Sequence, residues 1–313
     1  MRKYIFNRLI LLVPILLGIT FLTFAMMQFS AEDAVDMMFR QQGSVSEEVK
    51  AAVRAALGLD QPFLVQYWNW LKGVATGDMG RSFISGKLVF ETFAEKLPAT
   101  IELMLVSMLL TIFIATPLGI IAAVKQNKFV DYIIRGLSFA GNSMPNFFVG
   151  LLLIYFFALK LNLLPIISSG LQGVILPALT LTISMGAKYT RQIRAVVLEE
   201  LQKPYVLGAR SRGVDEVTIL LKSVLPSTLV MIITLLALST GSLLGGTAIV
   251  ETIFMWDGVG KMAIDAILMR DYPLIQAYVV WMAIIYVVIN LAADLMYRYL
   301  DPRVAWEEGD TDA

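Results

Sequence analysis

Long apolar runs dominate the pattern of hydrophobic and polar positions in this chain. A helix that crosses a bilayer needs roughly 20 mostly apolar residues, and six stretches approach that length with few charges. They cover residues 10–27, 101–124, 133–159, 174–198, 225–250 and 274–297. Pro145 interrupts the third stretch, so we expect a kink or a break there. The pattern predicts an all-α polytopic membrane protein with six transmembrane helices.

Two shorter amphipathic patterns lie between the first two spans. Ser44 and Glu47 have the spacing of a capping box, and the helix that follows should stop at Gly58. A second helix is expected to carry one apolar face, formed by Leu64, Tyr67, Trp68 and Leu71. Trp68 and Trp70 suit a membrane surface. We expect a small helical cap on the outer leaflet, because no set of acids, bases or nucleophiles typical of a catalytic domain occurs there.

The same pattern predicts the domain organisation. Residues 1–28 form an N-terminal transmembrane anchor, and residues 29–96 form an extracytoplasmic helical segment. A five-helix core covers residues 97–303, and residues 304–313 are a cytoplasmic tail. The basic residues ahead of the first run would also fit a signal peptide, but the run is long and no A-x-A site follows it. We therefore interpret the first run as a retained anchor.

Composition and charge agree with a membrane protein. The chain is 58% hydrophobic and 16% charged, whereas a soluble domain has about 25% charged residues. The net charge is zero, so no basic face for nucleic acid is implied. With a cytoplasmic N-terminus, the inner side holds fifteen Lys and Arg residues and the short outer loops hold three. This asymmetry predicts that the N-terminus and the C-terminus are both cytoplasmic (N-in/C-in).

The absence of two residue types limits the catalytic and metal-binding chemistry that this chain could perform. The chain contains no His and no Cys, which removes imidazole acid–base chemistry, thiol nucleophiles and the usual transition-metal ligands. We therefore predict no catalytic residue, no metal site and no cofactor. The sixteen methionines are better interpreted as flexible apolar filler than as a soft-metal pathway.

The most informative loop covers residues 199–225. Pro204 is placed to open a short helix, and Gly213 is placed to turn the chain. Asp215 should cap a second helix that runs to Val224, before Pro226 begins the next span. The residues alone leave two interpretations open. One is an ordinary amphipathic loop with the expected basic charge, and the other is a rigid docking element for a cytosolic partner.

The stretch YVLGARSRGVDEVTILLKSVLP resembles the EAA loop of ABC-importer permeases. Leu207, Gly208 and Ala209 occupy the E-A-A positions, and Gly213 is the glycine of the pattern. The leading Glu is absent, and Ser223 replaces the Ile near the end. Further stretches resemble the first permease subunit of dipeptide, oligopeptide and nickel importers. They are LGLDQPFLVQYWNWLKGVATGDMGRSF, LPATIEL, SMPNFF, ETIFMWDGVGKMAIDAI, RDYPLIQA and NLAADLMYRYLDPR.

This resemblance implies a type I ABC-importer permease fold that forms half of a pore. The implied partners are a second homologous permease subunit, two cytosolic ATP-binding subunits, an extracytoplasmic substrate-binding protein and the lipid bilayer. ATP hydrolysis would then occur on the separate subunits and not on this chain. The residues expected to couple the permease to the ATPases are Tyr205, Ala209, Arg210, Gly213, Leu225 and Pro226.

Two further sets of residues within the spans are candidates for function. Gly241, Gly245 and Gly246 allow close helix approach, either as ordinary packing or as part of the pathway or of a seam between two permeases. Asp294 and Arg298 have the i, i+4 spacing of an ion pair. We interpret them as a structural intramembrane pair, with a substrate or proton site as the alternative.

Other functions remain open at this stage. A secondary transporter or channel would show internal inverted repeats and charges near mid-membrane. No repeat is evident, and the first, second, third and fifth spans lack a central ionisable residue. An intramembrane enzyme lacks a plausible catalytic dyad. For the substrate we favour di- or oligopeptides, with nickel or a metallophore as the alternative and oligosaccharides as a third class.

Overall fold

The computed structural model describes residues 2–28, 34–39, 45–165 and 170–300. These residues form helices, with one isolated β-bridge between Arg81 and Leu88. The chain divides into two compact units. Unit 1 contains Met1–Thr100 and Asp257–Val288, and unit 2 contains Ile101–Trp256 and Ile289–Ala313. The long helices α5 (Val89–Val124) and α14 (Tyr272–Leu300) contribute to both units.

The other helices of unit 1 are α1 (Arg2–Gln28), α2 (Ala34–Phe39), α3 (Glu47–Ala56), α4 (Phe63–Ala75) and α13 (Val259–Met269). Those of unit 2 are α6 (Phe129–Ser143), α7 (Asn146–Leu153), α8 (Gly170–Gly173), α9 (Ile175–Leu201), α10 (Pro204–Ser211), α11 (Glu216–Ile219) and α12 (Leu225–Ile253). Two π-helical segments, η1 (Ile154–Lys160) and η2 (Leu220–Val224), continue α7 and α11.

In unit 1, α1 and α4 pack through aromatic side chains. Phe21 and Phe24 of α1 make edge-on contacts with Phe63 and Tyr67 of α4, at ring-centroid distances of 5.4–5.5 Å. The predicted apolar face of this helix was wrong in part, because Tyr67 packs against α1 but Leu64 and Trp68 do not. Its packed face follows Phe63, Tyr67 and Trp70, because these aromatic rings meet α1 at helical spacing. Leu64 and Trp68 are exposed, so of the two tryptophans Trp68 retains the position suited to a membrane surface.

Helix α3 begins later than its capping box predicts. Glu47 is its first residue, and Ser46 takes the N-cap position with an extended backbone. Ser44 lies outside the described residues. The predicted stop is confirmed, because Gly58 follows the C-cap Leu57 with φ +69°, a left-handed conformation that glycine adopts without strain.

The C-terminal part of unit 1 packs on the first half of α5. The Phe93 ring stacks on the Trp281 ring with centroids 5.9 Å apart. The buried carboxylate of Asp271 accepts hydrogen bonds from the Ser82 hydroxyl and from the Phe83 backbone N–H. These contacts join the turn before α5 to the corner between α13 and α14.

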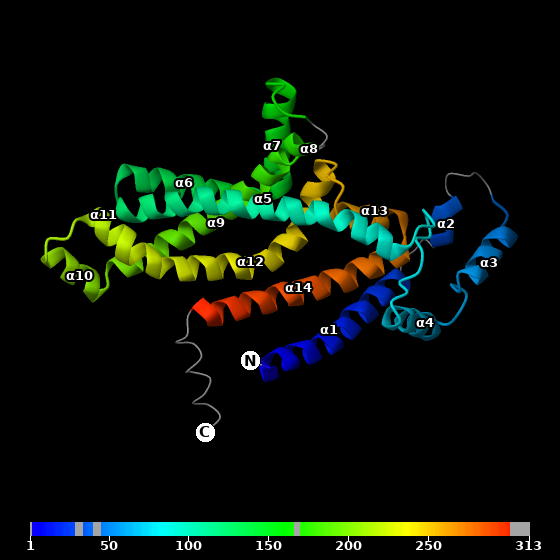
Figure 1. The fold of residues 1–313 in the computed structure, drawn as a ribbon. Helices are drawn as coiled ribbons and strands as arrows, with labels where there is room; N and C mark the ends of the chain where they lie inside the picture. The colour runs from blue at the N-terminus through cyan, green and yellow to red at the C-terminus, as the bar shows by residue number, and fades with distance from the viewer. Residues whose placement is uncertain (1, 29–33, 40–44, 166–169, 301–313) are drawn as a thin grey trace. The chain divides into compact units, whose positions relative to one another are not determined.

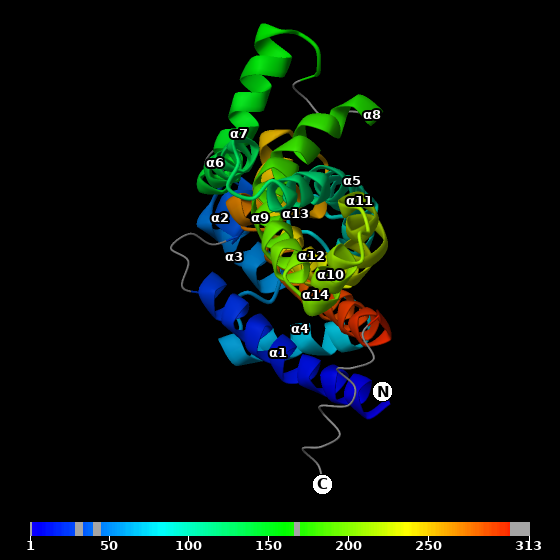
Figure 2. The same ribbon diagram turned by 90° about the vertical axis from the view of Figure 1, so that its left-hand side faces the viewer.

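Unit 2 is built around α9. In Figures 1 and 2 this helix lies between α6 and α12 of the same unit. Two glycines allow its neighbours to approach closely. A Cβ at Gly119 of α5 would lie 2.8 Å from the Ile193 Cβ, and one at Gly141 of α6 would lie 3.1 Å from the Ala187 Cβ. The close approach helps to bury 13 of the 27 residues of α9, which explains why this span tolerates more polar residues than the others.

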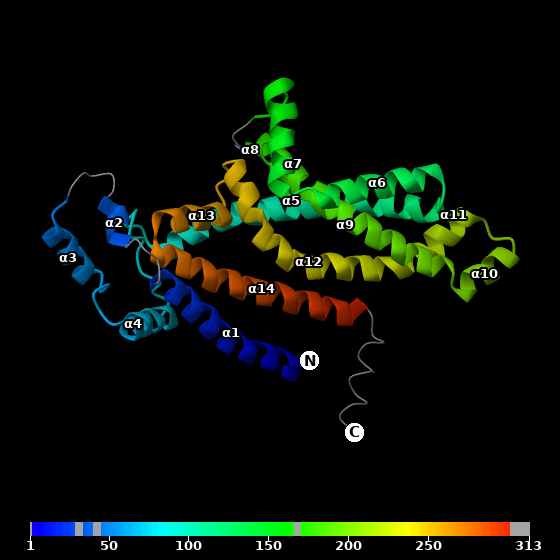
Figure 3. The ribbon, with the colours of Figure 1, turned by 180° about the vertical axis from the view of Figure 1, so that it is seen from behind.

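The expected break at Pro145 is confirmed. Helix α6 ends at Ser143, and α7 begins at Asn146 with Pro145 as its extended N-cap. The two helices are bent by 105°. Proline cannot donate the backbone hydrogen bond that would continue α6, and it holds its predecessor in an extended conformation. Helix α7 therefore leaves the α6–α9 pair at a steep angle (Figure 3).

Four helical stretches are long and apolar enough to cross a membrane: Ile10–Gln28, Val89–Val124, Glu216–Thr234 and Tyr272–Met296. The bent pair Phe129–Ser143 and Asn146–Lys160 adds a fifth if it is counted as one span. Each coincides with or overlaps a predicted span. The remaining prediction, residues 174–198, lies in the 27-residue helix α9, which is absent from this apolar set because of its polar second half.

Candidate coupling loop and a cavity in unit 1

Helix α10 is held by its apolar residues. Pro204 occupies its first turn, as the sequence predicts, and Lys203 is an extended N-cap. Val206 and Ala209 are buried and belong to one hydrophobic cluster of unit 2. The same cluster includes Val197 of α9 together with Ile219 and Val224 beyond the turn. Helix α10 therefore packs on the end of α9 and on the start of the next span, and it is held in place by these contacts. We call α10 and the turn at Gly213 the knob.

The turn at Gly213 is confirmed and forms a Schellman motif. Gly213 has φ +77°, the left-handed conformation. Its N–H donates to the Arg210 carbonyl at 2.9 Å, and the Val214 N–H donates to the Ala209 carbonyl at 3.2 Å. These two bonds satisfy carbonyls that would be unpaired at the end of a helix.

Asp215 caps the next helix, as predicted. Its Oδ2 accepts a hydrogen bond from the Thr218 backbone N–H at 2.9 Å. Arg210 reaches across the turn, and its Nε and Nη2 donate to the two carboxylate oxygens of Glu216 at 2.7 and 3.0 Å. Both side chains are exposed, so this pair fixes geometry more than it adds stability. Arg210, expected to contact a partner, therefore joins α10 to α11 within the loop.

Glu200 anchors the base of loop 199–225, and sequence analysis missed it. This nearly buried carboxylate accepts from the Tyr205 hydroxyl at 2.8 Å, and Lys203 Nζ lies 2.6 Å from its other oxygen. Burial opposes its ionisation, but the bonds from Lys203 and Tyr205 outweigh burial and lower its pKa. The i, i+3 spacing of Glu200 and Lys203 is the local signal that could have identified it.

The second helix of the loop ends at Val224, as predicted, and it runs into the next span without a break. The chain continues from α11 through η2 into α12, and the Leu225 N–H donates to the Leu220 carbonyl, five residues back. Pro226 lies in the first turn of α12. A proline ring clashes with the carbonyl four residues before it, and the wider π turn relieves that clash. Leu225 and Pro226 are therefore part of one continuous helix that leads from the loop into the membrane span.

The outward surface of this loop is apolar and basic. Leu207, Val217 and Leu221 are 54%, 63% and 56% exposed. Arg212 is exposed too, and among the described residues it has no carboxylate partner. Exposed apolar residues next to free cations on a rigid element are typical of a surface that binds another protein.

The Asp215 cap predicts a pH dependence. Hydrogen bonds from Thr218 hold the pKa of Asp215 below its ordinary range, so the cap is complete above the usual aspartate pKa of about 4 and is lost as the pH falls through the lowered value. We expect hydrogen-exchange protection of the Thr218 amide, relative to α9 amides, to fall only in acid. Asp215→Asn keeps a side-chain acceptor and should remove this pH dependence. Identical pH curves for the two proteins would contradict the role of the carboxylate.

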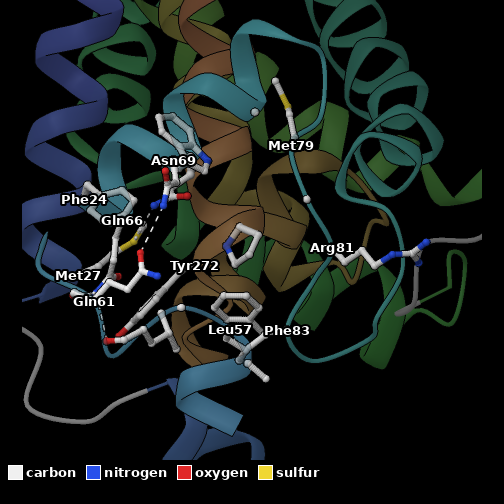
Figure 4. A pocket seen from close by; sticks show the side chains of 18 of the residues that line it. Phe24, Met27, Leu57, Gln61, Gln66, Asn69, Met79, Arg81, Phe83 and Tyr272 are labelled. Atoms are coloured by element: carbon white, nitrogen blue, oxygen red, sulfur yellow. Dashed lines mark hydrogen bonds between the residues drawn. The ribbon is translucent and has the colours of Figure 1, made fainter. Parts of the chain in front are cut away.

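Unit 1 contains a separate cavity of about 780 Å³ (Figure 4). Its wall includes side-chain amides and aromatic rings. Gln66 Nε2 donates to the Gln61 carbonyl at 2.7 Å, and Asn69 Nδ2 donates to the Gln61 Oε1 at 3.3 Å. Phe24, Phe83 and Tyr272 supply apolar surface. Asp36 at this cavity is paired with Lys50 and with Arg54. Asp78 and Arg81 also line the cavity, which therefore suits a polar group that both donates and accepts hydrogen bonds.

Comparison with known proteins identifies the chain. Residues 115–306 match the family described as "Binding-protein-dependent transport system inner membrane component", and residues 1–104 match its N-terminal family. The chain belongs to this permease family. It is the permease subunit of a binding-protein-dependent ABC importer and a component of the inner membrane.

The permease is similar to curated proteins over almost its whole length. It is 36% identical to the oligopeptide transport system permease protein AppB of Bacillus subtilis, over 98% of this chain and 100% of that protein. It is 33% identical to the metal-staphylopine import system permease protein CntB of Staphylococcus aureus, over 97% of this chain and 98% of that one. The glutathione transport system permease protein GsiC of Salmonella typhimurium is 34% identical, over 98% and 100% of the two chains.

Solved structures support the fold of the permease. The inward-facing MetNI methionine ABC transporter matches with a TM-score of 0.56 at 18% identity, over 68% of this chain and 97% of that chain. A crystal structure of an amino acid ABC transporter matches with a TM-score of 0.54 at 15% identity, over 67% and 94%.

Gly245 and Gly246 of α12 do not serve close packing among the described residues. A Cβ at Gly245 or Gly246 would meet nothing within 4 Å, whereas Gly119 and Gly141 do have close neighbours. Gly241 is buried. Gly246 instead lines a small cavity of about 140 Å³, together with Lys188 and other residues of α9 and α12. The open side of these glycines leaves the pathway or a seam with another subunit as their expected role.

Two charged pairs on the spanning helices differ in how far the structure describes them. Asp294 lies in α14, but the side chain of Arg298 is outside the described part, so their pairing stays a prediction. A pair that sequence analysis missed joins α6 to α9. Arg194 Nε and Nη2 donate to the buried Asp131 carboxylate at 2.7 and 2.8 Å. The 63 residues between the partners explain why no local pattern predicted it.

Proposed function

We propose that the permease forms half of a translocation pore and imports di- or oligopeptides. Its partners would be a second homologous permease, two cytosolic ATP-binding subunits and an extracytoplasmic binding protein. The proposed topology is six spans with both termini in the cytoplasm. The fifteen-to-three distribution of basic residues in the counted loops supports this orientation, and the length of α9 supports a sixth span.

The observation that carries the proposal is the rigid knob of loop 199–225. Val206 and Ala209 fix α10 on the core, and the continuous helix from α11 into α12 connects that knob to a membrane span. A displacement of the knob by an ATPase would therefore move α9 and α12 together. Tyr205, Arg210 and Gly213 would act mainly by holding the shape of the knob. Its exposed apolar and basic side chains would make the contact.

The proposed topology assigns a role to each part of the chain. Residues 1–28 would anchor the subunit and residues 29–96 would lie outside, where the binding protein delivers substrate. Residues 97–303 would form the pathway, and residues 304–313 would be a cytoplasmic tail. The amide-lined cavity of unit 1 would then open on the side of the binding protein. Its wall of amides and aromatic rings, which also includes the charged side chains of Asp78 and Arg81, offers hydrogen-bond donors and acceptors of the kind that a peptide uses, which supports the peptide class.

Reconstitution tests the function directly. The complete complex in proteoliposomes, with its binding protein, should hydrolyse ATP faster when short peptides are added and should accumulate the peptide only with ATP. The metal-staphylopine permease among its relatives makes a nickel–metallophore complex the second ligand to assay. Stimulation by the metallophore alone would replace the peptide assignment. Uptake driven by an ion gradient without ATP would overturn the importer mechanism.

Gly213→Val should abolish binding of the ATPases while leaving membrane insertion intact. A non-glycine residue in the left-handed region costs about 1–2 kcal/mol, and more when it is β-branched, so the Schellman turn should open and the knob should lose its shape. Co-purification of the ATPase subunits measures the effect. Gly208→Ala is the control, because its Cβ would meet only the Arg212 side chain at 3.8 Å. Normal co-purification with Gly213→Val would remove the turn from the coupling mechanism.

A further inference from the structure

A third cavity lies between α6 and α9, and the function proposed above does not use it. Its volume is about 530 Å³. Its lining residues are Tyr132, Arg135, Gly136, Phe139, Arg191 and Arg194. The four α6 residues have the spacing i, i+3, i+4 and i+7, and the two α9 residues have the spacing i, i+3. Both sets therefore form stripes along facing sides of neighbouring helices.

The charges of this cavity are not balanced within the described part of the chain. Asp131 is the nearby carboxylate, and both of its oxygens are occupied. Arg194 takes one hydrogen bond to each oxygen, and the Asn127 backbone N–H donates to Oδ2 at 3.0 Å. Arg135 and Arg191 have no ion pair among the described residues, and both are exposed. Two guanidinium groups therefore remain available to an anion.

The cavity is shaped for a group with an oxygen-rich head. The Arg135 guanidinium lies 5.7 Å from the centre of the Tyr132 ring, which holds it at one wall. Gly136 has no side chain, and a Cβ there would meet nothing within 4 Å. Arginine presents a planar fork of N–H donors that matches phosphate oxygens. A phosphate between Arg135 and Arg191 would find donors on two helices.

The surroundings of the two arginines are apolar. Ile133, Leu137 and Phe139 of the same helix are 44%, 69% and 69% exposed. Arg135 lies six residues after Phe129, the start of α6, which is about 9 Å along a helix axis. In the proposed topology this depth is close to the inner interface, where lipid phosphates lie. A soluble phosphate would have no use for the apolar wall, whereas a phospholipid would cover it with its chains.

We propose that Arg135 and Arg191 bind the phosphate of an anionic phospholipid of the inner leaflet, with its acyl chains against Phe139 and the adjacent apolar residues of α6. The inference rests on the proposed membrane orientation and not on the transported substrate. The site bridges α6 and α9. The bound lipid would therefore join α6, which follows the first inner loop, to α9, which leads into the knob. An acidic segment of the second permease subunit is the competing occupant.

Lipid retention in the purified complex tests this site. The complex is placed in nanodiscs of phosphatidylcholine with added phosphatidylglycerol, and the bound lipid is counted by native mass spectrometry. The doubly substituted R135Q/R191Q complex should bind phosphatidylglycerol at least about tenfold more weakly than the control, since it loses charge-assisted hydrogen bonds to the phosphate that the control keeps. The control is K125Q/K128Q, which removes the same charge from the neighbouring loop, outside the cavity. R135K/R191K should recover part of the binding.

Three outcomes would overturn the proposal. One is equal phosphatidylglycerol retention in R135Q/R191Q and K125Q/K128Q. Another is displacement of the lipid by inorganic phosphate or glycerol phosphate as effective as displacement by intact lipid, which would indicate a soluble phosphate site. The third is separation of the two permease subunits with unchanged lipid content, which would indicate a protein partner.

Photolabelling of the unaltered complex tests the site even if the doubly substituted complex does not assemble. Photoactivatable phosphatidylglycerol on the unaltered complex should label the peptide that contains α6. Labelling confined to other helices would reject the site. None of these measurements requires ATP or the binding protein, so failure of peptide import would leave the result on the lipid site intact.

Discussion

Asp131→Ala is expected to destabilise the permease by about 3–5 kcal/mol, far more than removal of an exposed carboxylate would. The Asp131 side chain is fully buried and the Arg194 side chain is 18% exposed. Removal of the carboxylate would leave the Arg194 guanidinium without a partner between α6 and α9. It would also place that charge beside Arg135 with no intervening anion. Unfolding in a denaturing-detergent titration, monitored by tryptophan fluorescence, measures the change.

Two control variants separate the effect of losing the ion pair from the effect of leaving a buried charge without a partner. Asp257→Ala removes a carboxylate whose side chain is 72% exposed and which pairs with Lys96, and it should cost less than about 1 kcal/mol. The doubly substituted Asp131→Leu/Arg194→Met protein removes both charges and should recover most of the lost stability. Equal losses in Asp131→Ala and Asp257→Ala would show that the buried pair does not hold α6 on α9.

Gly119→Ala should be the most disruptive single-methyl addition in unit 2. The new Cβ would lie 2.8 Å from the Ile193 Cβ and 3.0 Å from the Thr190 carbonyl oxygen. Neither atom is the flexible end of a side chain, so α5 and α9 would have to separate. Overpacking of this kind typically costs about 1–3 kcal/mol. We expect a lower midpoint in the same detergent titration and a lower yield of complex with the second permease.

Gly186→Ala provides the control on the facing helix. A Cβ at Gly186 would meet nothing within 4 Å, and alanine in a helix is favoured over glycine by about 1 kcal/mol. This substitution should therefore be neutral or stabilising. If Gly119→Ala were equally tolerated, the close approach of α5 and α9 would not be a requirement of the fold.

Local features of this permease could be predicted because they depend on neighbouring residues. The break at Pro145 follows from a missing N–H, and the turn at Gly213 follows from a left-handed backbone that glycine adopts freely. The Asp215 cap requires only an acceptor three residues before a free amide. The apolar runs predicted most spans by the same kind of reasoning. Errors arose where the local signal was ambiguous, as in α4, where aromatic residues at several positions could have formed the packed face.

The sequence by itself therefore determined that this chain is a helical membrane protein, that helices break at Gly58, Pro145 and Gly213, and that loop 199–225 is a short helix, a turn and a second helix. The tertiary structure alone decided that α9 is the central helix of unit 2, that Arg194 pairs with Asp131, and that Arg135 and Arg191 face one cavity. The physical reason is the distance along the chain over which each kind of interaction acts. Backbone hydrogen bonds and caps act over about four residues, whereas the partner of a buried charge depends on which helix faces bury each other, and that is settled only when the helices pack.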